Sequence, residues 1–278
     1  MTNIIEKSQN FWEELCGTNA FINLGLKDIN PNSLKVYDNW YMECYPYLNR
    51  YFDLDDIKEK DVLEIGLGFG TVGEMLALHS KSYTGLDYSV NPVNLLNQRI
   101  DWKNVSYKAK AVQGDAKALA FDANSFDFVV SIGCLHHTGN TKKAIEEVYR
   151  VLKPGGKALI MLYFKGAIRN YILEPLLYLT VKTFKKPRIY SSFKFNNLQE
   201  FQRGLKDFDS EGNVAPITES FNQNDVRELF SNFKMVQINK ENFKEINIPI
   251  FNKLINRKLF LNKVAKKFGI DLYINAIK

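Results

Sequence analysis

The chain has 278 residues, of which 45% are hydrophobic, so it is long enough to bury one substantial core. It carries 37 Lys and Arg against 31 Asp and Glu, and the basic excess lies in the second part: residues 1–164 hold 17 basic and 20 acidic residues, residues 165–278 hold 20 and 11. No uncharged apolar run reaches roughly eighteen residues and the start has no signal-peptide profile, so we expect a cytoplasmic protein without a transmembrane segment. Three cysteines and three histidines without ligand spacing argue against a disulfide framework and a metal site.

The first sixty residues are rich in aromatic side chains. Tyr37 and Tyr41 lie four apart, on one face if the segment is helical. Two interpretations stay open for them: packing on the core, or lining a ligand site.

A strand, a tight turn and a helix start follow between residues 62 and 79. The apolar run Val62–Ile65 leads into glycines at the alternate positions Gly66, Gly68 and Gly70, and a helical pattern begins at Thr71. Glycine is needed where a turn uses backbone angles that a β-carbon forbids, or where a ligand approaches the main chain. The free N–H groups at the helix start favour a polar or anionic ligand group. The same residues also match a dinucleotide-binding fingerprint that starts at Gly68. The tight turn begins at Gly66, directly after the strand, and this spacing argues against that fingerprint.

Acidic residues recur at successive strand ends. Glu64 belongs to the first strand, Asp87 ends the run from Tyr83, and Asp115 follows the run that begins at Val112. Asp is also common at loop starts and helix caps, so each acid alone has an ordinary structural explanation. Three acids at successive strand ends indicate a nucleotide-type ligand.

A fourth and a fifth strand are predicted at residues 126–133 and 157–163. Between them lie the stretch Cys134–Thr138, with His136 and His137, and an amphipathic helical pattern over residues 142–152 that Leu-Lys-Pro-Gly-Gly ends. A histidine titrates near neutral pH and can take a proton from a reacting group. The alternative is that one of the two packs against a ligand or caps the next helix.

Together these motifs resemble the class I S-adenosylmethionine-dependent methyltransferases, over residues 61–164. The Leu-His-His and Leu-Lys-Pro-Gly-Gly stretches are similar to the group with quinone-biosynthetic C-methyltransferases and many natural-product O- and N-methyltransferases. The resemblance implies an α/β fold: a doubly wound, mostly parallel, seven-stranded Rossmann-like sheet with its last strand antiparallel. It also implies S-adenosylmethionine as the cofactor.

The resemblance further implies a set of site residues. Glu64 would hold the methionine end of the cofactor, Asp87 the two ribose hydroxyls, and Asp115 with Ala116 the adenine. Either His136 or His137 would be the catalytic base at the methyl group. The full set expected to bind the cofactor is Glu64, Gly66, Gly68, Gly70, Thr71, Asp87, Tyr88, Asp115, Ala116, Ser131 and Tyr41.

The segments outside the core are expected to choose the acceptor. Residues 1–60 resemble a helical cap over the methionine end, residues 61–164 the cofactor-binding core, and residues 165–232 a lid insertion with a helix at 224–230. Within the lid, residues 167–184 are apolar but interrupted, which fits a helix pair over the acceptor or an interfacial segment. Residues 233–278 would complete the sheet, with strands at 233–238 and 272–277 and a basic insertion at 241–269 that we leave unassigned.

The sequence therefore predicts an enzyme that moves a methyl group to an O, N or S atom of a small-molecule acceptor. Two basic clusters, at residues 182–194 and 253–267, leave three alternatives open. These are a lipid or quinone methyltransferase at a membrane surface, an RNA methyltransferase, and a non-catalytic cofactor-binding scaffold. Nucleic acid is not the expected partner, because no RNA-binding module is recognisable. The oligomeric state and the identity of the acceptor stay open.

Overall fold

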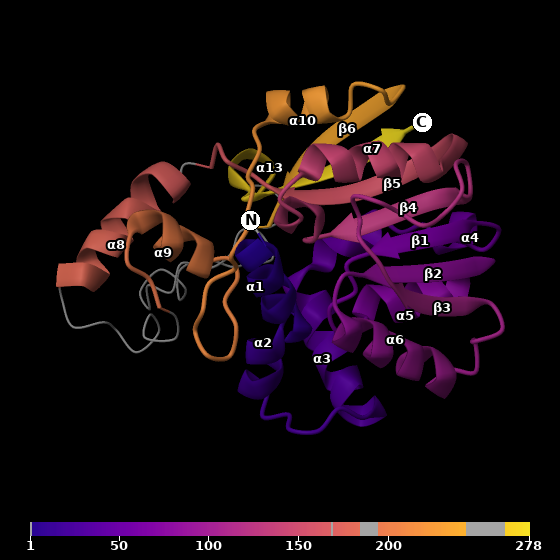
Figure 1. Ribbon diagram of the computed structural model, residues 1–278, viewed down its shortest axis with the longest axis horizontal. Coiled ribbons are helices and arrows are strands. Elements are labelled where there is room, and N and C mark those ends of the chain that lie inside the picture. Colours follow the sequence, from indigo (N-terminus) through magenta and orange to yellow (C-terminus); the bar gives the residue numbers. More distant parts are fainter. Residues whose placement is uncertain (1, 168, 184–193, 243–264) are drawn as a thin grey trace.

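The structure is a computed structural model that describes residues 2–167, 169–183, 194–242 and 265–278. Within these residues seven strands form one sheet in the order β3-β2-β1-β4-β5-β7-β6 (Figure 1). The strands are β1 (Asp61–Ile65), β2 (Ser82–Asp87), β3 (Ala109–Gln113), β4 (Phe126–Ile132), β5 (Leu152–Tyr163), β6 (Met235–Glu241) and β7 (Asp271–Ile277).

The predicted topology is confirmed. β1 pairs in parallel with both β2 and β4, and the parallel pairing continues from β2 to β3 and from β4 to β5. β7 runs antiparallel to its two neighbours, β5 and β6, and so lies between them as expected. Because the chain winds outward in both directions from β1 and β4, the carboxyl ends of these strands form the crevice where such sheets bind ligands.

Helices cover both faces of the sheet. α5 (Thr71–His79) and α6 (Val90–Trp102) lie on one face, and α7 (Thr141–Val151) and α10 (Gln223–Leu229) on the other (Figure 1). Successive residues of a strand point to opposite faces. Val62 of β1 accordingly joins the apolar cluster that includes Leu76 of α5, whereas Leu63 joins the cluster that includes Val148 of α7.

The N-terminal segment consists of α1 (Thr2–Glu13), α2 (Thr18–Asn23), α3 (Pro31–Cys44), a 3₁₀ helix (Pro46–Arg50) and α4 (Leu54–Ile57). α1 docks on the core through Glu13, whose carboxylate accepts from Val90 N and Asn91 N, each at 3.1 Å, at the start of α6. The helix dipole favours a carboxylate at that end. The N-terminal helices therefore lie close to the carboxyl end of β2, which leads into α6.

A buried arginine ties α3 to the core. Arg99 on α6 is 1% exposed and contacts Asp38 of α3 at 2.6 Å and Glu74 of α5 at 2.9 Å. Its Nη1 donates to Phe69 O at 2.8 Å, inside the glycine turn. Asp38 also accepts from the Thr71 hydroxyl at 2.7 Å. Because a buried guanidinium needs its partners, this network fixes the turn and the first residue of α5 together.

The lid segment forms a separate small unit at one end of the molecule (Figure 1). It contains a π-helix (Arg169–Leu173), α8 (Glu174–Thr183) and α9 (Leu198–Gly204). Val181 of α8 and Phe201 of α9 form the centre of an apolar cluster of their own. No helix among the described residues has the length and the apolar content to cross a bilayer.

The main differences from the predicted strand bounds are at β5 and β6, since β6 covers Met235–Glu241 rather than residues 233–238. β5 begins at Leu152 rather than Lys157, because Leu152 pairs with Phe126 and the strand then bulges before Lys157 pairs with Phe128. Of the basic insertion at 241–269, only α13 (Ala265–Phe268) and the residues beside it are described. Most members of the clusters at 253–267 and 182–194 lie outside the described residues, but Lys266 and Lys267 are on α13.

Candidate active site

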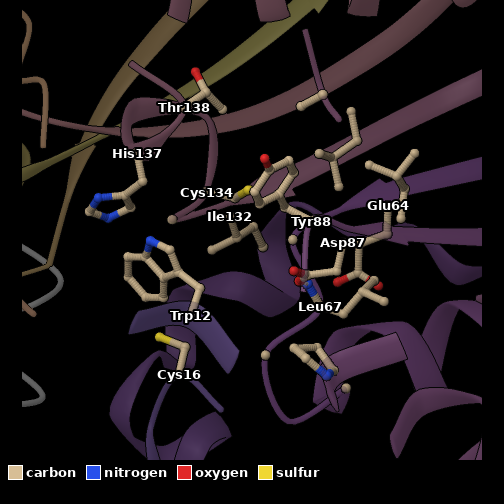
Figure 2. Close-up of a pocket in the computed structure, with 18 of the residues that line it drawn as sticks. Trp12, Cys16, Glu64, Leu67, Asp87, Tyr88, Ile132, Cys134, His137 and Thr138 are labelled. Carbon is tan, nitrogen blue, oxygen red and sulfur yellow. Dashed lines mark hydrogen bonds between the residues drawn. The ribbon is translucent and has the colours of Figure 1, made fainter. Parts of the chain in front are cut away.

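An elongated cavity opens at the carboxyl ends of β1, β2, β3 and β4. At one end it is lined by the glycine turn, Glu64 and Asp87, and at the other by Trp12, His137 and Ile217. Figure 2 shows this arrangement, with Glu64, Leu67 and Asp87 on one side of the view and Trp12 and His137 on the other. The cavity therefore lies in the crevice that the topology predicts.

The glycine turn has the conformation that its sequence predicts. Gly66, Gly68 and Gly70 all have positive φ, at 87°, 51° and 77°. At Gly66 a β-carbon would clash with the Cys134 side chain, whereas at Gly68 the nearest protein atom to such a carbon is 3.7 Å away. A β-carbon at Gly68 would only touch Cys16 at van der Waals distance, so the backbone of this cavity-lining residue leaves room for a ligand against the main chain. α5 starts at Gly70 without a side-chain cap, so its first N–H groups remain available to a polar ligand group.

Glu64 is a buried carboxyl, only 4% exposed. The Tyr83 hydroxyl donates to its Oε2. Burial raises the pKa of Glu64 to about 8, the negative charge of Asp87 adds to this rise, and the Tyr83 hydrogen bond and Arg99 oppose it. A carboxyl held in this way gains most from a cationic ligand group, which favours its ionised form.

Asp87 joins the second strand to the glycine turn. Its Oδ2 accepts from Leu67 N at 2.8 Å and its Oδ1 from Ser89 N at 3.0 Å. Burial raises the pKa of Asp87, and these backbone hydrogen bonds oppose the rise because they stabilise the ionised carboxylate. Each oxygen keeps a lone pair for a ligand hydroxyl, so the carboxylate can anchor the turn and bind a diol at once.

Asp115 lies in the loop after β3 and also lines the cavity. Its Oδ1 accepts from Lys117 N at 2.9 Å, and Lys117 Nζ lies 3.1 Å from the same carboxylate. Lys117 Nζ also donates to Thr138 O at 3.1 Å and lies 5.9 Å from the centre of the Tyr88 ring. These contacts fix the loop after β3 against the loop after β4, with the Tyr88 ring beside them.

His137 stands at the other end of the cavity. Its Nδ1 lies 2.7 Å from Ile217 O; since a carbonyl only accepts, Nδ1 carries the proton and Nε2 holds a lone pair. Nε2 makes no hydrogen bond in the described part of the chain. Burial lowers the pKa of His137, partly opposed by Asp207, so the ring is neutral near pH 7. A neutral imidazole with a free lone pair is a proton acceptor.

The lid brings a carboxylate to this histidine. Asp207 follows α9, and its Oδ2 lies 3.5 Å from His137 Nε2 and accepts from the Tyr163 hydroxyl at 2.8 Å. Trp12 of α1 packs against the His137 ring with the ring centres 4.6 Å apart. The end of the cavity at His137 is therefore assembled from α1, from the loop after β4 and from the lid.

Comparison with known proteins identifies the core. A family model described as a methyltransferase domain matches residues 63–160. Residues 63–160 therefore match a methyltransferase domain, and the sheet has the fold of an S-adenosylmethionine-dependent methyltransferase. S-adenosylmethionine is the cofactor of this family, and the glycine turn and the three acids fit it.

The relatives of the methyltransferase domain share this core but not the whole chain. Phosphoethanolamine N-methyltransferase 2 of Caenorhabditis elegans is 36% identical over 109 residues, which are 38% of this chain and 24% of that protein. Phthiotriol/phenolphthiotriol dimycocerosates methyltransferase of Mycobacterium tuberculosis is 37% identical over 103 residues, 36% of this chain and 37% of that protein. The chain thus spans less than half the length of these curated relatives.

A solved structure supports the fold. An S-adenosylmethionine-dependent methyltransferase from Methanosarcina mazei superposes with a TM-score of 0.52 at 20% identity, covering 84% of this chain and 97% of that one. At this identity the likeness concerns the fold alone.

The cavity of the methyltransferase domain brings together all but two of the residues that the sequence predicted. Tyr41, His137 and the other predicted cofactor contacts line it. Ser131 does not, because it lies within β4 and its hydroxyl donates to Ile65 O at 2.8 Å. His136 does not either: it is fully buried, with its ring centre 4.0 Å from that of Tyr163. Its pKa lies well below the usual value, mainly because of burial.

Several residues of the site were missed from the sequence. Trp12 stands in the aromatic stretch that predicted a cap, but nothing in the sequence distinguished it from its neighbour Phe11. Ile217 and Asp207 belong to the predicted lid, and their contacts to His137 span 80 and 70 residues. No motif marks such contacts. Tyr37 and Tyr41 do both things proposed for them, since they belong to an apolar cluster and also line the cavity.

Proposed function

We propose that this chain transfers the methyl group of S-adenosylmethionine to an oxygen, nitrogen or sulfur atom of a small-molecule acceptor. The observation that carries the proposal is that one cavity holds the glycine turn and three acids at one end and a neutral histidine at the other. When bound, S-adenosylmethionine supplies an activated methyl group on a sulfonium, so the protein mainly aligns the acceptor and excludes water.

The cofactor end has a group for each part of this molecule. Glu64 would pair with the ammonium of the methionine end, Asp87 would accept from the ribose hydroxyls, and Asp115 would contact the adenine amino group. The open backbone at Gly68 leaves space for the chain that joins these parts. The curated relatives named above are methyltransferases, which agrees with this assignment.

At the acceptor end, His137 is the candidate base and His136 is not, because only His137 lines the cavity. Nε2 of His137 would take the proton of a hydroxyl acceptor as its oxygen is methylated. The resulting imidazolium would lie 3.5 Å from Asp207, whose negative charge stabilises it. An amine or thiol that is reactive at neutral pH would need only the positioning.

The cap and the lid close this end of the cavity. Glu14, just after α1, accepts from Ser210 N at 2.8 Å and from the Ser210 hydroxyl at 2.6 Å in the lid. Asn19 Nδ2 also donates to Phe208 O at 3.0 Å. We accordingly keep the division into a cap at 1–60, a core at 61–164, a lid at 165–232 and closing strands at 233–278. In this division the cap and the lid jointly exclude water from the reacting atoms.

A cytoplasmic location is part of the same proposal. Cys16, Cys44 and Cys134 form no disulfide among the described residues, which suits a reducing compartment.

Calorimetry and methyl transfer test the proposal. We expect S-adenosylmethionine and S-adenosylhomocysteine to bind, NAD not to bind, and label from methyl-labelled cofactor to pass to a component of a metabolite extract. Tight NAD binding without response to either sulfur compound would overturn the cofactor assignment. Cofactor binding without transfer to any extract or RNA fraction would indicate a scaffold. Transfer to RNA alone, with salt-dependent RNA binding, would replace the small-molecule acceptor.

A further inference from the structure

α8 and the π-helix before it present apolar side chains to solvent. Tyr171, Ile172, Leu176 and Leu179 are 63%, 60%, 62% and 58% exposed, and Leu173 is 39% exposed. Leu173, Leu176 and Leu179 recur every three residues, so they share one helix face. Single exposed apolar residues are common on proteins, but five within nine residues form a patch that indicates an interaction surface. We call these five residues the α8 apolar face.

The orientation of this face is fixed by packing on the opposite side of the helix. Val181 is 2% exposed and packs in the apolar cluster with Phe201 of α9, and Leu177 and Tyr178 pack against the same cluster. One set of apolar residues on α8 therefore packs inside the lid itself. The α8 apolar face remains on the outside, at the end of the molecule that lies away from the sheet (Figure 1).

The sequence on either side of the α8 apolar face is basic. Between residues 165 and 199 the sequence contains seven Lys and Arg and a single acid, Glu174. Glu174 is 3% exposed, whereas Lys182 in the last turn of α8 is exposed. A helix that combines an apolar face with nearby cations and no exposed acid matches the surface of an anionic bilayer.

We propose that the α8 apolar face inserts into the headgroup region of an anionic lipid bilayer, with Lys182 on the lipid phosphates. Leu173, Leu176 and Leu179 would enter the boundary of the acyl chains. Tyr171 carries the apolar ring with a polar tip that suits this boundary. Since none of the described helices is able to cross a bilayer, α8 would lie along the surface.

The structure connects this surface to the acceptor end of the cavity. Gln202 of α9 donates through Nε2 to Asn170 O at 2.7 Å, in the π-helix. Asp207, just after α9, reaches His137. A bilayer on the α8 apolar face would therefore lie on the lid that closes the acceptor end, which favours an amphiphilic acceptor drawn from the membrane. This last consequence rests on the proposed methyl transfer, but the binding of the bilayer does not.

Vesicle co-sedimentation of the full chain tests the proposal without cofactor or acceptor. The probes are vesicles of phosphatidylcholine alone and of phosphatidylcholine mixed with phosphatidylglycerol. We expect binding to the mixed vesicles that weakens with salt. Leu179→Asp should lower the partition coefficient at least about tenfold, because a charge replaces an apolar side chain that the bilayer would otherwise bury. Lys182→Glu should lower the partition coefficient by roughly fivefold or more for each unit of charge that the substitution changes.

The matched controls change exposed residues that lie on other elements. Met235 on β6 is also 58% exposed, so Met235→Asp makes the change of Leu179→Asp away from the α8 apolar face. Lys110→Glu on β3 reverses an exposed charge as Lys182→Glu does. Both controls should bind vesicles like the unchanged protein, and all four variants should keep its thermal unfolding midpoint.

Three results would overturn the proposal. The first is no binding of the unchanged protein to the mixed vesicles. The second is equal binding by Leu179→Asp and Met235→Asp, which would place the contact elsewhere. The third is a dimer in solution that Leu179→Asp dissociates, without vesicle binding, which would show that a second copy covers the face. A failure of methyl transfer alone would leave the vesicle result standing, so the two proposals fail separately.

Discussion

The two ends of the cavity are built in different ways. The cofactor end comes mainly from residues 64–116 of the core, in which backbone conformation at Gly66, Gly68 and Gly70 and carboxyls at strand ends form the site. The acceptor end comes from side chains of α1, the loop after β4 and the lid, which meet at His137. A substitution at one end should therefore change cofactor affinity alone, and one at the other end should change turnover alone.

The largest effect is expected at the acceptor end. His137→Ala removes the candidate base, so turnover of a hydroxyl acceptor should fall about 10²- to 10⁴-fold with little change in S-adenosylhomocysteine affinity. Steady-state kinetics and calorimetry measure the two quantities. His79→Ala, at the end of α5 and away from the cavity, serves as the control and should change neither. Near-normal turnover of His137→Ala would leave positioning alone to carry the reaction and favour an amine or thiol acceptor.

At the cofactor end the sharpest change is Gly68→Val. The side chain would be added to the cavity wall at a φ of 51°, and cofactor affinity should fall by roughly a thousandfold, about 4 kcal/mol. Gly25→Val is the matched control, because Gly25 has a φ of 75° and no atom within 4 Å of the added carbon but lies outside the cavity. Both variants carry the backbone strain, so only the difference between their calorimetric affinities reports on the site. Equal affinities would contradict a ligand at Gly68.

Asp87 tests whether one carboxylate both anchors the turn and binds the ligand. Asp87→Ala should weaken cofactor binding by roughly 2 to 4 kcal/mol, because charge-assisted hydrogen bonds are lost from a buried site. Asp87→Asn keeps one acceptor oxygen and should lose less. Titration calorimetry gives both values. A loss below about threefold in Asp87→Ala would assign the ribose to another residue.

Asp207 of the lid is expected to act through His137, as a positioning residue. His137 acts in its neutral form, so the rate should rise with pH through its pKa and then level off. Asp207→Asn removes the charge that holds this pKa up, so the limb should move to lower pH and the plateau should drop by about tenfold to a hundredfold, since a weaker base accepts the proton. Tyr163→Phe keeps the carboxylate and should leave the limb close to its original position. A pH profile of Asp207→Asn with an unmoved limb would assign Asp207 a purely structural part.

The smallest effect concerns the pH dependence of cofactor binding. Burial raises the pKa of Glu64 to about 8, so at lower pH the free protein holds a neutral carboxyl that must lose its proton to pair with a cation. S-adenosylhomocysteine affinity should rise with pH up to about 8 and then become constant. Tyr83→Phe removes a hydrogen bond that lowers this pKa, so the limb should move to higher pH.

Tyr51→Phe provides the control for this pH dependence. The Tyr51 hydroxyl donates to Glu241 at 2.8 Å, and neither residue lines the cavity. The loss of this hydroxyl should leave the pH dependence of cofactor affinity unchanged.

The raised pKa of Glu64 also lowers the stability of the free protein as pH rises from 4.5 to about 8, because folding then keeps a proton that the unfolded chain releases. Glu64→Gln should abolish that loss, as denaturant titrations at the two pH values would show; an unchanged loss would mean that Glu64 titrates normally.

The contrast between the two ends also explains what the sequence was able to predict. The strand order, the glycine turn and the acids at strand ends follow from local patterns, because a strand, a turn and a helix start each depend on a few neighbouring residues. Ser131 was wrongly expected at the wall of the cavity, since strand alternation places Ile132 there instead. The choice of His137 over His136 depends on packing against Tyr163 and on the lid.

The lid residues were beyond sequence patterns for the same reason. Asp207 meets His137 only because α9 packs on α8 and the chain then returns past the loop after β4. Contacts over such separations depend on tertiary packing, and a single sequence carries no spacing rule for them.

A crystal structure of the chain with S-adenosylhomocysteine tests the central claim most directly. We expect the adenine at Asp115, the ribose hydroxyls on Asp87, the methionine ammonium at Glu64, and the sulfur facing the end of the cavity that holds Trp12 and His137. A nucleoside bound outside this cavity, or one whose sulfur points away from His137, would contradict the assignment of the two ends.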